Sequence, residues 1–518
     1  MLETGVRQFR LAMGMVWGRR LSPRNVARLV DDALDTIAEF GQPGPEALEV
    51  LGGPLADPQE KIEWANHGLR RTARRLAATS PFYARRFEAA QADPEALDLA
   101  GMRAIPVTTK HELIEYAADF RCTDVPGYLA TRTTGTTGRP AEVWLSRYEM
   151  DLWPALGALG SVLRGDLRPG DMMQVNVSSR AIAANHLAAA SCRLAHAMCR
   201  LLGILSPDES LDSLSQGGTT LLLTCPSYLA ELVSAARRRD LGPDDFRLRR
   251  VTVGGEVLSP SLARAACQTL GVAEIEDTYS MTEVIPVTGR TCSQRHVHHD
   301  VNNGLTELLD LRTGEPAGPG ALGTIVVTPY FPHRDCMPVF RFDTRDVARC
   351  LPEEGLDCEL AGIPATSQVL GKADHLLWLS ADEVVTPRQL IEAIEALPSA
   401  PWPARYRVEL IDGRIRLTLP AAAIAGYGEA AACRHFADAG LDADLAIAAL
   451  GVHPAVRLPH VARLMGAGAP GPGPGWLEVV LSWPGRIIRP GWHPDLRPAR
   501  DPDLCATPDT DLRPAATG

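Results

Sequence analysis

The polar and apolar positions near the start of the chain follow a helical repeat. Between residues 7 and 40, apolar side chains recur every three or four positions, which is the spacing of one helix face. Ser22-Pro23 places an N-cap residue before a proline and predicts a helix start. The pattern from 60 to 91 predicts two further helices, divided near Ser80-Pro81. We therefore expect a helical N-terminal extension over residues 1–75.

From residue 128 to 349, short apolar runs alternate with helical patterns. The runs predict strands at 171–177, 219–224, 250–254 and 323–328. Helices are predicted between them at 184–202, 228–238 and 261–270. This alternation favours the α/β class, as a large N-terminal mixed α/β domain whose sheets are covered on both faces.

The pattern changes after Lys372. A helix is predicted at 390–397, and two strands are predicted at 406–411 and 414–419, around the turn pair Asp412-Gly413. We expect a small mobile α+β C-terminal domain after a hinge. The predicted units are a helical extension at 1–75, a large domain at 76–371, the small domain at 372–465, and a Gly/Pro linker with a partly disordered tail at 466–518.

Composition narrows the class of protein. The 518 residues are 45% hydrophobic and 22% charged, which is ordinary for a globular chain. A net charge of −11 argues against a nucleic-acid partner. We expect no membrane association, because no apolar run reaches the ~18 residues that span a bilayer. The first residues lack a signal-peptide pattern and the eleven cysteines show no framework spacing, so we expect a cytoplasmic protein.

A loop rich in threonine and glycine carries the first chemical signal. The run from Thr133 to Pro140 reads Thr-Thr-Gly-Thr-Thr-Gly-Arg-Pro, between two predicted short strands at 127–131 and 141–145. Glycine permits close approach of the backbone, and N–H and hydroxyl groups donate to anionic oxygens. The spacing is not that of a Walker P-loop. The loop suits a polyphosphate, although a simple Thr-rich hairpin has the same pattern.

The order of five motifs gives this loop a context. With the other four, it resembles the adenylate-forming superfamily, which holds acyl- and aryl-CoA ligases, peptide-synthetase adenylation domains and luciferases. The motifs lie at 133–140, 254–256, 279–283, 341–346 and 371–374. Further runs at 80–83, 106–110 and 224–228 are similar to the phenylacetate-CoA ligase branch. The resemblance covers about residues 75 to 415.

This resemblance implies ATP or AMP and Mg²⁺ as cofactors. The residues implied in nucleotide binding are Thr133, Thr134, Gly135, Thr136, Thr137, Gly138, Arg139, Gly254, Gly255, Glu256, Asp277, Tyr279, Ser280, Met281, Thr282, Asp346, Arg349 and Lys372. Tyr279 matches the position whose ring stacks on adenine, and Asp346 matches the aspartate that binds both ribose hydroxyls. Thr282 would donate to the α-phosphate, and Glu283 would hold Mg²⁺.

Two departures from the family pattern stand at the same sites. Ser280 replaces a common glycine, and Arg345 replaces the glycine of the usual Thr-Gly-Asp run. Lys372 and Asp374 resemble the hinge about which the small domain rotates. For the acid pocket we expect contributions from His186, Ser227 and Gly255, with the stretch 176–185 beside them.

A missing lysine complicates the expected catalysis. The family carries a C-terminal lysine between the acid and the α-phosphate, yet the only lysines here are Lys61, Lys110 and Lys372. Gly485-Arg486-Ile487-Ile488-Arg489 has the shape of the lysine motif, with Arg486 in the lysine's place. Arginine keeps the charge but is planar and bulkier. Arg486 is therefore a candidate catalytic residue, and the alternative is that it lies on the surface of the tail.

A second constellation has the chemistry of a zinc site. Thiolate and imidazole ligands suit tetrahedral Zn²⁺, and some members of the branch carry a structural zinc in this region. The expected ligands are Cys292, His298, Cys350 and Cys358, with His296, His299 and Cys336 as alternatives. Unrelated buried thiols beside a surface histidine cluster would have the same sequence pattern.

We predict an enzyme that uses ATP to activate a small aromatic or short-chain carboxylic acid as an acyl-adenylate, with release of pyrophosphate. The partners would be the acid and a nucleophilic acceptor, which is CoA, a carrier protein or an amine, and a homodimer stays open. Two alternatives remain: the same fold activating an inorganic acid such as nitrite or forming an amide, and a nucleotide-binding protein that has lost turnover.

Overall fold

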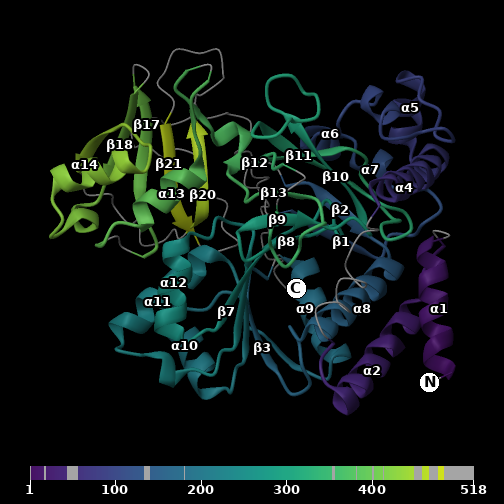
Figure 1. Cartoon of the computed structure of the whole chain (residues 1–518), viewed down its shortest axis with the longest axis horizontal. Coiled ribbons are helices and arrows are strands. Elements are labelled where there is room, and N and C mark those ends of the chain that lie inside the picture. Colours follow the sequence, from purple (N-terminus) through teal and green to yellow (C-terminus); the bar gives the residue numbers. More distant parts are fainter. Residues whose placement is uncertain are drawn as a thin grey trace, which may run out of the picture.

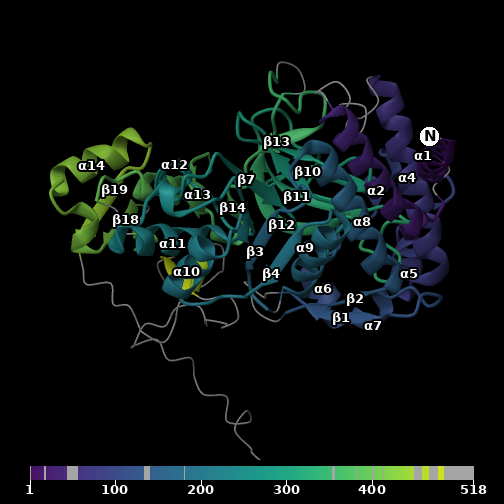
Figure 2. The ribbon, with the colours of Figure 1, turned by 90° about the horizontal axis from the view of Figure 1, so that it is seen from below.

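The computed structural model describes residues 2–16, 19–43, 57–133, 140–179, 181–352, 356–380, 382–399, 402–411, 414–447, 458–465 and 476–482. Figures 1 and 2 place α14 and β18 at one end of the molecule and α1 and α4 at the other. Within the described ranges, no helix is long and apolar enough to cross a membrane.

Two helices form the first part of the chain, as the apolar spacing predicted. They are α1 (Leu2–Val16) and α2 (Pro23–Phe40), and the Ser22 side chain accepts a hydrogen bond from the Asn25 N–H at the start of α2. Val26 and Val30 of α2 are buried in apolar clusters that also hold residues of α8 (Arg147–Arg164). Helix α2 therefore packs against α8 (Figure 1), and an ion pair between Arg7 and Asp32 joins α1 to α2.

The next helices frame one edge of the molecule. They are α4 (Pro58–Thr79), α5 (Pro81–Ala89), α6 (Lys110–Glu115) and α7 (Ala117–Phe120). Ser80 ends α4 and caps α5, so the predicted break at Ser80-Pro81 is confirmed. Thr109 forms a capping box with Glu112 and thereby fixes Lys110 as the first residue of α6.

An eight-stranded sheet is the centre of the fold. Its order is β13-β9-β8-β7-β6-β5-β3-β4, with β3 to β7 parallel and β8, β9 and β13 antiparallel. The strands are β3 (Met172–Asn176), β4 (Met198–Leu201), β5 (Leu221–Thr224), β6 (Arg250–Gly254), β7 (Glu274–Tyr279), β8 (Gly289–Thr291), β9 (His296–His299) and β13 (Ala365–Ser367).

Helices cover both faces of this sheet. On one side lie α10 (Pro207–Gln216), α11 (Pro226–Arg238) and α12 (Pro260–Leu270), and on the other lie α8 and α9 (Ile182–Leu194) (Figure 1). The apolar clusters agree, because α10, α11 and α12 share one core and α8 and α9 contribute to two others. The prediction of a mixed α/β fold with covered sheets is confirmed.

One predicted helix is shorter than expected. We predicted a helix over 184–202, but α9 ends at Leu194, His196 takes a positive φ of 56°, and β4 follows. The backbone of β4 pairs in parallel with β3 from Met198 to Leu201. This tertiary pairing outweighs the helical propensity of the alanine-rich run.

A second, antiparallel sheet lies beside the first. It contains β10 (Gly304–Asp310), β11 (Leu322–Pro329), β12 (Phe342–Arg349) and β14 (Gly371–Lys372), in that order. The strands flanking the Gly/Thr loop are also present, as β1 (Leu129–Arg132) and β2 (Glu142–Leu145), paired antiparallel. Residues 134–139 of that loop lie outside the described residues.

The C-terminal part has a core of its own. It contains β15 (Leu377–Trp378), β16 (Val384–Val385), α13 (Pro387–Glu395), α14 (Glu429–Asp438) and a five-stranded sheet of order β19-β18-β17-β21-β20. The sheet strands are β17 (Tyr406–Ile411), β18 (Arg414–Leu419), β19 (Ala443–Ile447), β20 (Leu458–Met465) and β21 (Trp476–Ser482). The predicted pairing of 406–411 with 414–419 is confirmed. The turn at 412–413, the linker at 466–475 and the tail from 483 lie outside the described residues.

Candidate nucleotide site and metal cluster

Two neighbouring parallel strands end at one edge of the large sheet. Gly254 ends β6 opposite Thr278, and Tyr279 ends β7. A Cβ at Gly254 would lie 2.8 Å from the Thr278 carbonyl oxygen, and Gly255 has a φ of +80°. Both positions therefore favour glycine, and the loop after β6 passes close to the end of β7. Ligands of open α/β sheets bind at the carboxyl ends of the strands, so this edge is the candidate nucleotide site.

Three predicted residues from three strands meet at this edge. The Tyr279 hydroxyl donates to Asp346 Oδ2 at 3.0 Å, and Lys372 Nζ lies 2.7 Å from Asp346 Oδ1. Lys372 also donates to the Thr344 carbonyl at 2.9 Å. Burial and the neighbouring Asp346 carboxylate raise the pKa of Tyr279 well above its ordinary value, so the hydroxyl stays protonated and remains a donor. The arrangement holds the Asp346 carboxylate in place through two donors.

A buried carboxylate and a lysine form a second pair in this region. Glu283 is 3% exposed, and its Oε1 lies 3.2 Å from Lys110 Nζ at the start of α6. Lys110 ends the motif at 106–110, and no role was expected for it from the sequence. The available signal in the sequence was the scarcity of lysine: the chain has only three, and one of them lies beside the predicted Mg²⁺ ligand. A carboxylate oxygen is a suitable Mg²⁺ ligand. The contact with Lys110 is made by Oε1 of Glu283 and not by Oε2.

Ser227 and Glu256 form part of the same edge. Glu256 accepts hydrogen bonds from the Ser227 N–H at 2.8 Å and from the Ser227 hydroxyl at 3.0 Å. The carboxylate thereby caps the N-terminus of α11. Asp277 of β7 accepts from Gln368 Nε2 at 3.2 Å, and burial raises its pKa to about 6 despite the nearby guanidinium of Arg388. Ser227, predicted for the acid pocket, thus contacts Glu256, predicted for the nucleotide, and Asp277 contacts Gln368 in the segment after β13.

Other predicted residues have different surroundings. The His186 ring Nε2–H donates to the Met150 carbonyl at 2.8 Å, which links α9 to α8. Arg349 is exposed at the end of β12 and donates to the Gly320 carbonyl at 2.6 Å. Asp346 and Arg349 are three residues apart on a strand, so their side chains leave opposite faces of the sheet. The expected role of Arg349 in nucleotide binding stays a prediction.

The phosphate loop is described only at its ends. Thr133 is buried, and its hydroxyl accepts a hydrogen bond from the Ala141 N–H at 3.1 Å. This contact closes the base of the loop that joins β1 to β2. Thr134 to Arg139, and also Arg486, lie outside the described residues, so their expected roles stay predictions.

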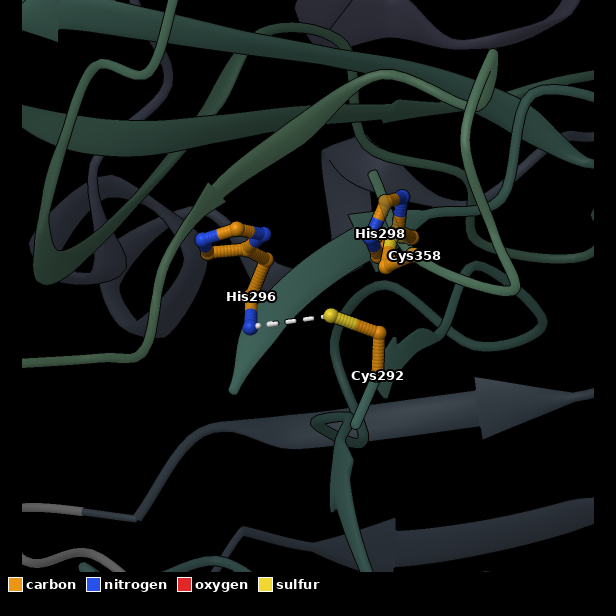
Figure 3. Close-up of side chains that lie close together, drawn as sticks. All are labelled: Cys292, His296, His298 and Cys358. Atoms are coloured by element: carbon orange, nitrogen blue, oxygen red, sulfur yellow. Dashed lines mark hydrogen bonds between the residues drawn. The ribbon is translucent and has the colours of Figure 1, made fainter. Parts of the chain in front are cut away.

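Four cysteine and histidine side chains gather at the β8–β9 hairpin (Figure 3). They are Cys292, His296, His298 and Cys358, and their ligand atoms all lie within 4.8 Å of one another. His298 Nε2 lies 3.3 Å from Cys358 Sγ, and the His296 N–H donates to Cys292 Sγ at 3.2 Å. The hairpin brings three of the four residues together, and the fourth comes from the segment before β13.

The donor set of this cluster fits zinc. The six distances between ligand atoms of a tetrahedral Cys₂His₂ zinc site are about 3.3–3.8 Å, so modest side-chain rotations would bring the four atoms to these distances. His296 Nδ1 is buried with no hydrogen-bond partner among the described residues. His298 Nδ1 donates to the Ile363 carbonyl at 3.0 Å, which fixes the ring orientation and leaves Nε2 for a metal. Burial lowers the pKa of His298, which favours the neutral imidazole that binds metals.

One expected zinc ligand is replaced by another. Cys350 is absent from the described cluster, and His296 takes its place. Cys350 follows β12 and forms a bridge with Thr366 of β13, whereas β9 pairs with the opposite edge of β13. Its thiol donates to the Leu351 carbonyl. The sheet therefore separates Cys350 from the hairpin, which the sequence spacing alone did not indicate.

The chain is similar to known AMP-binding enzymes and CoA ligases. Residues 131–330 match the AMP-binding enzyme family. The chain is 25% identical to a phenylacetate-coenzyme A ligase of Pseudomonas putida over 325 residues, which is 61% of this chain and 71% of the relative. It is 26% identical to the phenylacetate-coenzyme A ligase of Thermus thermophilus over 358 residues, 66% and 77% of the two chains. The crystal structure of 2-hydroxyisobutyryl-CoA ligase with 2-HIB-AMP, in the postadenylation state, superposes with a TM-score of 0.65 at 20% identity, covering 76% of this chain and 86% of that one.

The match of residues 131–330 to the AMP-binding enzyme family confirms the resemblance that the five motifs indicated, and the superposition shows the same fold. The curated relatives are phenylacetate-CoA ligases, which agrees with the predicted branch. The prediction of an enzyme of the AMP-forming ligase kind is confirmed by the same similarities.

Proposed function

We propose that this chain activates a small carboxylic acid with ATP and transfers the acyl group to CoA. The observation that carries the proposal is the Asp346 carboxylate, held between Tyr279 and Lys372 at the edge of a family-matched nucleotide domain. Asp346 offers oxygen acceptors without a competing donor, which suits the two hydroxyls of a ribose. The Tyr279 ring would then cover the adenine.

The first half-reaction needs positive charge near the α-phosphorus. A carboxylate oxygen of the acid attacks this phosphorus, the bond to the bridging oxygen breaks, and pyrophosphate leaves with the electron pair. Charge stabilisation dominates this kind of chemistry. Thr282 would donate to the α-phosphate, Thr134 to Arg139 would bind the β- and γ-phosphates, and Glu283 would hold Mg²⁺.

Lys110 is our candidate for a cation supplied by the large domain. Its ammonium contacts the Glu283 carboxylate, and the capping box at the start of α6 fixes the position of its backbone. A lysine at this place could stabilise negative charge on the phosphates even though no lysine follows Lys372. Arg486 stays the second candidate for this role.

The second half-reaction transfers the acyl group. The CoA sulfur attacks the carbonyl carbon of the acyl-adenylate, the carbon–oxygen bond to the phosphate breaks, AMP leaves, and the thiol proton passes to solvent. CoA is supported as the acceptor because the matched relatives are CoA ligases. The similarities do not favour nitrite activation or amide formation. For the acid we propose an aromatic or short-chain carboxylate, with His186, Ser227 and Gly255 at the pocket.

We further propose that Cys292, His296, His298 and Cys358 hold a structural zinc ion. The support is the compact donor set and the unpartnered Nδ1 of His296 among the described residues. A zinc ion there would join the β8–β9 hairpin to the segment before β13. The cluster is separate from the residues assigned to the nucleotide, so its contribution would be to the fold.

One experiment tests the proposed activity. The purified full chain is incubated with ATP, Mg²⁺, CoA and a panel that contains phenylacetate, benzoate, 2-hydroxyisobutyrate, acetate and nitrite. We expect pyrophosphate and AMP with at least one carboxylate, and the acyl-CoA product by mass spectrometry. The Asp346→Ala variant is the matched control. Release of AMP with nitrite alone, or no AMP with any carboxylate, would contradict the proposal.

A further inference from the structure

Arg345 has an unusual backbone conformation for its residue type. It lies on β12 between Thr344 and Asp346 and has a φ of +59°, in the left-handed region that non-glycine residues rarely adopt. The resemblance predicted a glycine here. The Arg345 N–H donates to Asp343 Oδ1 at 2.8 Å, which supports this conformation. An arginine that keeps a strained backbone position calls for a reason in its side chain.

The Arg345 side chain reaches the segment that leads into the C-terminal unit. Its guanidinium forms an ion pair with Asp374 and lies 3.8 Å from the Asp343 carboxylate. Asp374 belongs to the 3₁₀ turn Ala373–His375, directly after β14. One guanidinium therefore links strand β12 of the large domain to the predicted hinge.

A second ion pair ties the same two segments. Lys372 of β14 pairs with Asp346 of β12, one residue from Arg345. The two ion pairs differ in whether they use a residue that is expected to bind the nucleotide. Asp346 is the expected ribose ligand, so nucleotide binding draws on its oxygens, whereas the Arg345–Asp374 pair uses neither of them. The Arg345–Asp374 contact is thus available whether or not nucleotide is bound.

The backbone after Asp374 directs the whole C-terminal unit. Leu377, three residues on, is fully buried in the core of that unit. Gly371, just before the hinge, has a φ of +137°, and a Cβ there would lie 2.5 Å from Pro387 Cγ at the start of α13. A small change of torsion near Asp374 therefore moves α13 and everything that packs on it.

We propose that Arg345 is a positioning residue that, through Asp374, sets the balance between two orientations of the C-terminal unit. The inference rests on the proposed two-step reaction, because each half-reaction would use one orientation. Crystal structures of 2-hydroxyisobutyryl-CoA ligase described as the postadenylation, open and thioesterification states superpose on this chain with TM-scores of 0.65, 0.57 and 0.54. That ligase has thus been crystallised in more than one conformation.

The test measures orientation directly and needs no turnover. Cys433 is exposed on α14 of the C-terminal unit and Glu88 is exposed on α5. Each is replaced by p-acetylphenylalanine, whose ketone takes a spin label without reaction at the half-exposed cysteines Cys199, Cys225, Cys267, Cys350 and Cys358. Distance distributions are recorded for the full chain, with and without AMP. The variants are Arg345→Gly, Asp374→Asn, their combination and Arg345→Lys. Glycine accepts the positive φ at no cost, so Arg345→Gly removes the ion pair without disturbing the β12 loop.

We expect Arg345→Gly and Asp374→Asn each to change the ratio of the two distance populations by about 1.5- to 5-fold, the range for half-exposed ion pairs. The double variant should change it no further, and Arg345→Lys should restore part of the native ratio. Arg85→Ala removes the pair with Asp119, which is similarly exposed and lies within the large domain, and it should leave the distribution unchanged.

Two outcomes would overturn the inference. One is a native distance distribution in Arg345→Gly, and the other is additive effects of the two single variants, which would mean that the residues act separately. If the acid panel identifies a substrate, the variants should also alter the ratio of adenylate formation to thioester formation while KM for ATP stays constant. Failure of the acid panel leaves the spin-label test intact, so a failure of the proposed function can be told apart from a failure of this inference.

Discussion

The replacement of Lys110 by alanine tests whether the large domain supplies the catalytic cation. Lys110 Nζ and Glu283 Oε1 are 3.2 Å apart, which corresponds to an attraction of about 1 to 5 kcal/mol between effective dielectric constants of about 80 and 20. The lysine side chain is 26% exposed, so the lower half of this range is more realistic. If the ammonium instead acts on charge that develops at the α-phosphate, its loss should cost about 10²–10³ in the rate of adenylate formation, or about 2.7–4 kcal/mol of barrier.

The assay separates these two effects. Single-turnover formation of the acyl-adenylate is measured with the acid that the panel identifies, ATP affinity is measured by calorimetry, and stability by thermal unfolding. We expect Lys110→Ala to slow adenylate formation steeply, to change ATP affinity modestly, and to leave conversion of a preformed acyl-adenylate with CoA nearly native. Lys61→Ala is the matched control, because Lys61 donates to the Gly362 carbonyl away from Glu283.

Comparison with Arg486 decides between the two candidate cations. If Arg486 acts in the lysine's place, Arg486→Ala should produce the steep loss and Lys110→Ala a small one. Full adenylate formation in Lys110→Ala, with native stability, would refute our argument for Lys110. Full activity after deletion of the chain beyond Gly466 would make Arg486 irrelevant and leave the cations of the large domain and the hinge.

Three further predictions concern binding, metal and pH. Asp346→Ala should weaken ATP binding by about 1–3 kcal/mol, the cost of unpaired polar partners, and unchanged affinity in calorimetry would reject its role. Metal analysis should find one zinc per chain after dialysis, and Cys358→Ser should lower the melting temperature and lose the metal, whereas Cys350→Ser should retain it. Burial raises the pKa of Glu395 from 4.5 to about 7 where it accepts a hydrogen bond from Ser259 across the α12–α13 contact. The native state then holds a proton that the unfolded chain has lost, so the free energy of unfolding should fall as pH rises from about 4.5 to about 7, and Glu395→Gln should flatten this slope.

Local signals in the sequence determined most of the secondary structure and the expected type of site. Ser22 and Ser80 cap helices because their hydroxyls and the following prolines act within one turn of chain. The strands of the large sheet were predictable from short apolar runs. Tyr279 and Asp346 both belong to motifs of the resemblance, but the contact between them came only from the structure.

Tertiary structure decided the features that depend on segments distant in the chain. Residues 198–201 form β4 because their backbone pairs with β3. The helical pattern of this run in the sequence contains no information about that pairing. Sheet order placed His296 rather than Cys350 in the Cys/His cluster, since hairpin geometry and strand pairing cannot be read from residue spacing.

The Lys110–Glu283 and Arg345–Asp374 ion pairs join residues 173 and 29 positions apart. The sequence determined which charges the chain possesses, through its three lysines and the arginine at a usual glycine position. Only the folded chain decided which carboxylate each charge meets, because an ion pair depends on distances of a few ångströms that packing alone establishes.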